Sequence, residues 1–362
     1  MFYYLLYPLR EIWFGFNVFR YITFRASMAA ITSFLICVIL GPYVIDMLRR
    51  LKVGQYVRKE HVDGIYDHHK HKEGTPTMGG VLIIMAVLLS TFLWCRPDND
   101  LIILAAGSMV WLGIIGVIDD GIKLRNKSSK GVRAITKLFG QTVFALIVGL
   151  FVYRNAAIGT ELYIPFMKNA IANLGLFYIV FVFFVIVGTS NAVNLTDGLD
   201  GLAIGCVIFI SITYSVMSYI TGHAAMSEYL QVFYLPGAGE LTVFCAALTG
   251  AGLGFLWFNC HPATVFMGDT GSLAIGGALA TVSVLIKKEV LLFIVGGVLV
   301  VETLSVMLQV ASCKYRKKRM FLMTPIHHHF QMKGWHESKI TVRFWIVAAI
   351  LAMLSMATLK VR

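Results

Sequence analysis

Long apolar runs, separated by short polar loops, constrain the fold of this chain more than any other feature of its sequence. Each run has about the 20 residues that a helix needs to cross a bilayer. With 58% hydrophobic and 14% charged residues, the chain differs from a soluble domain, in which about 25% are charged. We expect an all-α polytopic membrane protein with about ten transmembrane helices, at residues 22–47, 75–95, 100–118, 134–152, 171–188, 199–219, 240–257, 263–286, 289–312 and 341–359.

The spans are expected to form one domain. No low-complexity segment marks a boundary within residues 21–362, which we predict to be a single integral-membrane domain. Residues 1–20 place aromatic side chains such as Tyr4 and Trp13 beside Arg10, a combination typical of membrane interfaces. They lack the small-residue cleavage site of a signal peptide. We therefore predict an interfacial N-terminal segment over residues 1–20.

The basic residues indicate how the chain is oriented. Its net charge is +12, and the loops around residues 49–72, 123–133 and 314–339 hold roughly twice as many Lys and Arg as the opposite loops and both tails. Positive loops face the cytoplasm, so we expect a bacterial inner-membrane protein with both termini in the periplasm. Charges placed in topology loops favour membrane lipid and anionic substrates as partners, and no nucleic acid.

Most polar residues that could carry chemistry fall on the predicted cytoplasmic face. Asp119 and Asp120 end the third span, and His327–His329 lies in the long basic loop before the last span. The turn between spans five and six, and the turn between spans seven and eight, hold the others: Asn191, Asn194, Asp197, Asp200, Asn259 and Asp269. Such segregation to one face is hard to obtain from a purely structural protein.

The adjacent pair Asp119 and Asp120 can be read in two ways. On a helix, neighbouring side chains diverge by about 100°. The two are therefore not expected to bind one ion equally, and one near a metal with the other acting as a base is the better assignment. The alternative is an acidic pair at a solvated helix end.

The acids of the later turns also have two interpretations each. Asp197 and Asp200 are three residues apart and share a face if the segment is helical, although either Asp197 or Asn194 could simply cap the sixth helix. Asp269 stands among glycines and hydroxyls, and Mg²⁺ prefers one or two carboxylates together with phosphate oxygens. We predict Asp269 to be a Mg²⁺ ligand that faces a pyrophosphate, with a capped helix start as the alternative.

The histidine run and the start of the second span favour anions. His327–His329 has no cysteine or spaced histidine partner for a soft metal, so protonatable donors for a phosphate fit better, and His328 joins the candidate catalytic residues. The hydroxyls of residues 75–77 follow basic residues and open a helix. Lys137, Glu302 and Arg343 are unusual within spans, and interhelical hydrogen bonding is the expected role of Glu302 and Gln309. The chain has no Walker A motif.

These motifs together resemble a known family. Asp119-Asp120, residues 191–201 and residues 266–272 are similar to the polyprenyl-phosphate N-acetylhexosamine-1-phosphate transferase superfamily. Within this superfamily, the phospho-N-acetylmuramoyl-pentapeptide-transferase family is the one that the chain resembles at residues 72–80, at residues 325–330 and from Gly334 to Trp345. The resemblance runs from about Arg20 to the C-terminus.

The resemblance implies ten transmembrane helices, a homodimer and a cytoplasmic active-site cleft. It implies transfer of phospho-MurNAc-pentapeptide from UDP-MurNAc-pentapeptide to undecaprenyl phosphate, with Mg²⁺, giving lipid I and UMP. It makes Asp269 the metal ligand, and Asp119 and Asp120 bases for the lipid phosphate or supports for the metal. A uridine pocket would contain Lys72, Asp200, Asn259 and Phe266, with the Phe266 ring on uracil. The remaining substrate contacts would be Thr77, Asn194, Asp197, Gln309, His327 and His328.

Two other classes of function compete with this interpretation. A sister enzyme would use UDP-GlcNAc, but the histidine run and residues 72–80 argue against it. A transporter or lipid flippase would place its charged site near the middle of the bilayer and often show repeated halves. In this sequence the acids lie at one interface and the two halves show no obvious repeat.

Overall fold

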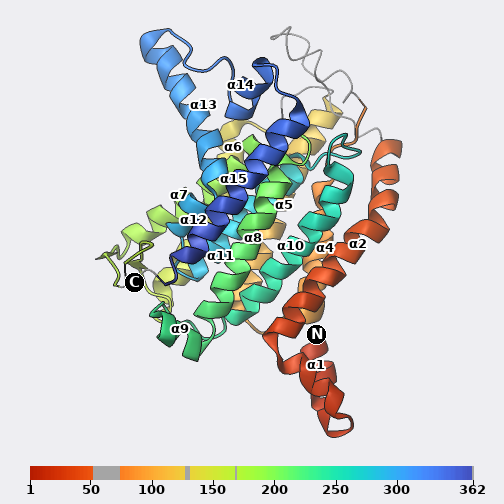
Figure 1. The fold of residues 1–362 in the computed structure, drawn as a ribbon, viewed down its shortest axis with the longest axis vertical. Coiled ribbons are helices and arrows are strands. Elements are labelled where there is room, and N and C mark those ends of the chain that lie inside the picture. The colour runs from red at the N-terminus through yellow and green to blue at the C-terminus, as the bar shows by residue number, and fades with distance from the viewer. Residues whose placement is uncertain (52–73, 127–130, 168, 361–362) are drawn as a thin grey trace.

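The computed structural model describes residues 1–51, 74–126, 131–167 and 169–360, which form a bundle of long helices (Figure 1). The longer helices are α2 (Ile22–Arg50), α4 (Gly80–Trp94), α5 (Asp100–Arg125), α6 (Ala134–Arg154), α7 (Phe177–Thr196), α8 (Leu202–Thr221), α10 (Gly239–Asn259), α11 (Gly268–Leu285), α13 (Gly297–Arg316) and α15 (Glu337–Ala357). Short helices are α1 (Phe2–Leu6), η1 (Tyr7–Glu11), η2 (Phe14–Arg20), α9 (Ala224–Leu230), α12 (Leu291–Val295) and α14 (Ile326–Met332). A two-stranded antiparallel hairpin, β1 (Glu161–Leu162) and β2 (Ala172–Asn173), lies between α6 and α7.

The all-α membrane architecture is confirmed. Within the described residues, nine helices are long and apolar enough to cross a bilayer, and the shorter apolar helix α4 occupies the predicted second span. The two termini lie at the same end of the bundle, opposite α14, as an even number of crossings requires (Figure 1). The predicted ninth span, 289–312, is divided: α12 ends at Val295, and α13 begins after Gly296.

Two predicted helix ends were wrong. The third span was expected to end near residue 118, with Asp119 and Asp120 at the end of its helix, but α5 continues to Arg125 and places both residues more than one turn before that end. The fifth span was expected to end near residue 188, but α7 continues to Thr196, so Asn191 and Asn194 lie on the helix and not in the following turn. The apolar run marks only the part of a helix that contacts lipid. Backbone hydrogen bonding can continue the helix beyond that run, where its polar side chains find partners on other helices.

Helix α11 lies at the centre of the bundle, and nearly all its residues are buried. Small residues such as Gly276 and Gly277 allow this burial: Gly276 lies against the backbone of Ser190 on α7, and Gly277 lies against Leu112 on α5. Beside this group, α10 packs against α2 and α8. The helix that carries Asp269 in its first turn is therefore held firmly on several sides.

The N-terminal segment lies beside the start of α2, at the end of the bundle that holds the termini (Figure 1). There the Arg25 guanidinium forms two hydrogen bonds of 2.7 Å with the Glu240 carboxylate, and both side chains are buried. Trp13 and Phe14 are largely exposed, at 64% and 82%. These exposed rings suit a membrane interface, but the interfacial role of residues 1–20 and the single domain over 21–362 stay predictions.

Candidate active site

Three carboxylates meet at the end of the bundle opposite the termini. Asp119 and Asp120 come from α5 and Asp269 from the first turn of α11, and each offers an oxygen within 4.8 Å of the others. Both residues of the α5 pair are almost fully buried. The divergence expected for adjacent helical residues therefore does not keep either of them away from Asp269.

Two glycines permit this approach. A side chain at Gly116, one turn before Asp120, would collide with the backbone of Asp269 and Thr270, so α11 can reach α5 only because this position is glycine. Gly268 begins α11 with a φ of +73°, a conformation that favours glycine, and an added Cβ there would lie 2.8 Å from Asp120 Oδ2 and 2.9 Å from Thr77 Oγ1. Thr77 is thereby placed beside the cluster.

Asp120 caps the start of α11. Its Oδ2 accepts hydrogen bonds from the Thr270 backbone N–H at 2.9 Å and from the Thr270 hydroxyl at 2.8 Å. A carboxylate at a helix N-terminus satisfies free N–H groups and interacts favourably with the helix dipole. Asp119 has different partners: its Oδ1 accepts a hydrogen bond of 2.9 Å from the Val132 N–H. Of the two, Asp120 fixes the helix that carries Asp269, and Asp119 faces the basic side of the site.

Two lysines that we did not select from the sequence complete the cluster. Lys123 Nζ lies 2.6 Å from Asp119 Oδ2 and 3.1 Å from Asp269 Oδ2, while Lys137 Nζ lies 2.5 Å from Asp269 Oδ2. Lys123 follows Asp119 and Asp120 by four and three residues, a spacing that places it over both on a helix, so this signal was present in the sequence. Lys137 was noted only as an unusual charge, because nothing local connects the start of α6 with α11.

The C-terminal end of α7, together with the residue that follows it, reaches the same cluster. The Asn194 side chain donates hydrogen bonds of 2.8 Å to Asp269 Oδ1 and to Ser272 Oγ, which orients the Asp269 carboxylate. Asp197 follows the end of α7, where burial, together with the negative charges of Asp269 and Asp120, raises its pKa to about 7. Asn194 and Asp197, both predicted substrate contacts, are thus part of the same electrostatic environment.

The predicted uridine-pocket residues form a neighbouring group. Asn259 accepts a hydrogen bond from the Gly201 N–H at 3.1 Å and donates one of 2.8 Å to the Val265 carbonyl, next to Phe266. Asp200 Oδ2 accepts a hydrogen bond from the Ala263 N–H at 3.1 Å and lies 3.0 Å from His261 Nδ1. Asp200, Asn259 and the backbone next to Phe266 are therefore brought together, with His261 as a neighbour that we did not predict. Lys72 lies outside the described residues.

The histidine run lies in α14. His327 is buried, its Nδ1 lies 3.0 Å from Glu302 Oε2, and its ring lies against Gly198 in the turn after α7. Glu302 thus links α13 to α14, as its expected interhelical role requires. The neighbouring His328 ring has its centroid 4.2 Å from that of His327. Gln309 differs from expectation: among the described residues, its amide binds the backbone of Met320 and Phe321, in the loop after α13, instead of another helix.

Comparison with known proteins agrees with this site. The family model described as Glycosyl transferase family 4 matches residues 101–287, and the phospho-N-acetylmuramoyl-pentapeptide-transferase signature 1 matches residues 72–84. The full chain is 54% identical to the phospho-N-acetylmuramoyl-pentapeptide-transferase of Desulfotalea psychrophila and 53% identical to those of Citrifermentans bemidjiense and Geobacter sp., covering 100% of each. The chain belongs to the phospho-N-acetylmuramoyl-pentapeptide-transferase family. It is therefore a transferase of peptidoglycan synthesis and a multi-pass membrane protein.

The donor set of this transferase fits a hard divalent cation. Asp119, Asp120 and Asp269 supply carboxylate oxygens within 4.8 Å of one another, and oxygen is the ligand type that Mg²⁺ prefers. The described part of the cluster offers no thiolate or imidazole that would select a softer metal. Two lysines balance part of the negative charge, which leaves the group net negative and suited to a cation.

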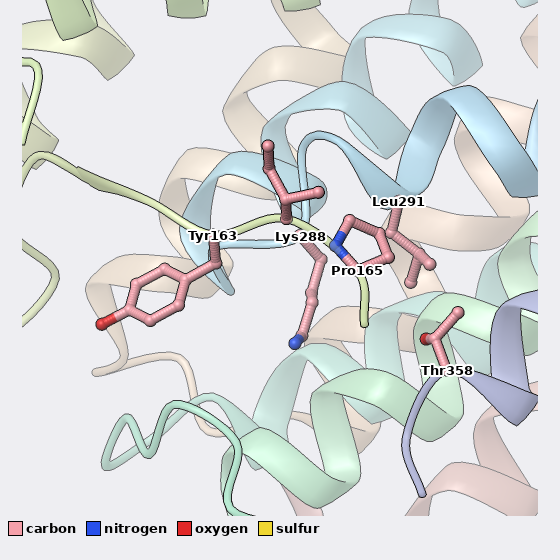
Figure 2. Close-up of a pocket in the computed structure, with 6 residues that line it drawn as sticks. Tyr163, Pro165, Lys288, Leu291 and Thr358 are labelled. Atoms are coloured by element: carbon pink, nitrogen blue, oxygen red, sulfur yellow. The ribbon is translucent and has the colours of Figure 1, made fainter. Parts of the chain in front are cut away.

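The transferase also has an apolar groove that runs along α7 toward the helix end that carries Asn194. It lies between α7 and the α12–α13 break, and is lined mostly by apolar residues that include Phe184, Ala192, Leu292, Leu299, Leu304 and Met307. Ala192 lies two residues before Asn194, which binds Asp269. A second, small pocket near the C-terminal end of α15 is lined by Tyr163, Pro165, Lys288 and Thr358, without a carboxylate (Figure 2).

Proposed function

We propose that this transferase moves phospho-N-acetylmuramoyl-pentapeptide from UDP onto undecaprenyl phosphate, giving lipid I and UMP. The observation that carries the proposal is the cluster of Asp119, Asp120 and Asp269 with two lysines, at a bundle end reached by an apolar groove. A water-soluble nucleotide and a lipid phosphate can meet only at such a boundary. The names of the full-length relatives support the substrate.

The uridine, the phosphates and the prenyl chain of the substrates each have a proposed partner. We assign the uridine to Asp200, Asn259 and Phe266, with Lys72 by resemblance, and the prenyl chain to the groove between α7 and α13. The ammonium groups of Lys123 and Lys137 neutralise phosphate charge, since phosphoryl transfer depends mainly on positioning and charge stabilisation. Further contacts are proposed for Thr77, Asn194, Asp197, Gln309, His327 and His328.

The acids have separate proposed tasks. Asp269, oriented by Asn194, is the proposed Mg²⁺ ligand, with Asp119 beside it. Asp120 holds the start of α11 and so positions Asp269. When bound, Mg²⁺ would screen the pyrophosphate and stabilise departing UMP. A lipid phosphate is already a nucleophile, so we favour its direct attack on the sugar-nucleotide phosphate over an aspartyl-phosphate intermediate.

The orientation and assembly follow as further proposals. The ends of α2 and α13 that border basic loops lie at the same end of the bundle as α14 (Figure 1), so we place the active site on the cytoplasmic face of a bacterial inner membrane, with both termini in the periplasm. We also infer a homodimer, as the family resemblance implies.

The test is an assay for UMP with the purified full-length chain, UDP-MurNAc-pentapeptide, a polyprenyl phosphate and Mg²⁺. We expect UMP release that requires both substrates and the metal. Asp269→Asn should release none while still inserting into the membrane, because it removes the oriented carboxylate. UDP-GlcNAc serves as the competing substrate: faster release from it would assign the chain to the sister activity and overturn the proposal.

A further inference from the structure

Two basic side chains lie together on one face of α15, near the N-terminus of this helix. Lys339 and Arg343 are four residues apart, so they share a face, and both are exposed. Both lie over one ring: the Arg343 guanidinium carbon is 4.4 Å, and the Lys339 ammonium nitrogen 5.3 Å, from the Trp335 ring centroid. Trp335 in turn stacks on Phe330, with 4.7 Å between centroids. The two cations thus share a fixed aromatic platform.

These cations have no anionic partner in the described part of the chain. Neither Lys339 nor Arg343 forms an ion pair with a carboxylate there, although cation–π contact with Trp335 holds both in place. An arginine on a membrane-spanning helix normally pairs with a carboxylate or reaches the headgroup layer. We place Arg343 in the second environment, because it lies within two turns of the start of α15 and beside Trp335, a residue type enriched at membrane interfaces.

The same face continues into the membrane as an apolar stripe. Ile346, Ile350 and Met353 follow Arg343 by three, seven and ten residues, the spacing of one helix face, and they are 53%, 57% and 68% exposed. Exposed apolar side chains on a spanning helix contact acyl chains. The arrangement of two cations and an aromatic ring above an apolar stripe matches a phospholipid with an anionic headgroup.

We propose that Trp335, Lys339 and Arg343 form a binding site for an anionic phospholipid, whose acyl chains lie along Ile346, Ile350 and Met353. The phosphate of the headgroup accepts hydrogen bonds from the guanidinium and the ammonium group. One net negative charge on the lipid is enough. Phosphatidylglycerol has one such charge, which balances half of the +2 charge of Lys339 and Arg343. Zwitterionic phosphatidylcholine carries its own cation and is the weaker ligand.

The opposite face of α15 connects this site to the turn that carries Asp200. Thr341 donates a hydrogen bond of 3.3 Å to the Asp200 carbonyl, and the Trp345 indole donates one of 3.1 Å to the Gly201 carbonyl. Thr341 and Trp345 are each two residues from Arg343, which places them about 200° around the helix. A lipid that holds one face of α15 therefore also restrains the turn that the other face supports.

Native mass spectrometry of the full-length chain tests the proposal, with phosphatidylglycerol and phosphatidylcholine of the same acyl chains as probes. We expect the wild type to retain phosphatidylglycerol preferentially. The double variant Lys339→Gln, Arg343→Gln should bind it about 30-fold more weakly, the factor for two charges near a membrane surface. The matched control Lys314→Gln, Lys317→Gln removes two basic residues at the exposed end of α13 and should keep the wild-type preference.

Three outcomes would overturn the site. Unchanged phosphatidylglycerol binding by the double variant would exclude these cations, and equal loss in the α13 control would show an effect of net charge alone. A dimer that buries the stripe and carries no lipid would assign the face to a second copy of the chain. If the double variant does not fold, Lys339→Gln alone, at an exposed position, should still weaken binding about fivefold. None of these results depends on the transfer reaction.

Discussion

At the residue scale, the chemistry of the site depends on a small group of opposite charges that partly neutralise one another. Three carboxylates from Asp119, Asp120 and Asp269 face the ammonium groups of Lys123 and Lys137. Hydrogen bonds from Asn194 to Asp269 Oδ1 and from Thr270 to Asp120 Oδ2 fix the orientation of these two carboxylates. A single substitution therefore changes both the charge and the geometry of the group.

Lys137→Gln is expected to reduce the rate of UMP release about 10- to 100-fold, because a substrate phosphate loses one charged hydrogen-bond donor, worth about 1.5–3 kcal/mol. Initial rates in the purified transfer assay measure the effect. Lys314→Gln, which removes an exposed lysine at the end of α13, should leave the rate unchanged. Wild-type turnover by the Lys137 variant would mean that its contact with Asp269 has no part in transfer.

At the element scale, close approach of helices builds the site. Helix α11 can bring Asp269 to α5 because Gly116 has no side chain. The cap from Asp120 then fixes the first turn of α11 at this crossing. The break between α12 and α13 also shapes the molecule, because Gly296 at this break lines the groove between α13 and α7.

Gly116→Ala should abolish most of the activity and lower the melting temperature, because its Cβ would collide with the backbone of Asp269 and Thr270. The control is Gly107→Ala on the same helix, where an added Cβ meets no atom within 4 Å. That variant should be neutral or slightly more stable, since alanine favours a helix by up to about 1 kcal/mol over glycine. Transfer assays and thermal unfolding distinguish the two, and equal behaviour would show that the crossing is not tight.

At the scale of the whole molecule, the proposal requires all the clustered acids on one side of the membrane. The chain offers natural probes for this, because Cys260 and Cys313 are exposed whereas Cys37, Cys95, Cys206 and Cys245 are buried. Cys260 follows α10 close to the Asp200 group, and Cys313 lies near the end of α13.

A membrane-impermeant thiol reagent should label Cys260 and Cys313 in inside-out vesicles and leave them unlabelled in intact spheroplasts. Cys260→Ser and Cys313→Ser should each remove one site. As a positive control, Glu161→Cys in the exposed β1 strand of the α6–α7 loop should be labelled from the outside. Labelling of Cys260 from the outside would place the site on the wrong face and refute the orientation.

The sequence by itself determined the number of crossings, the common side of the termini and the residue types available for chemistry. These follow from run length and from the distribution of charge, and both are local properties. The tertiary structure decided which groups meet. A helix that is apolar on every side does not reveal which neighbour each face contacts, so Lys137 beside Asp269 could not be predicted. Neither could the extension of α5 and α7 past their apolar runs, because the partners that stabilise those ends come from helices distant in sequence.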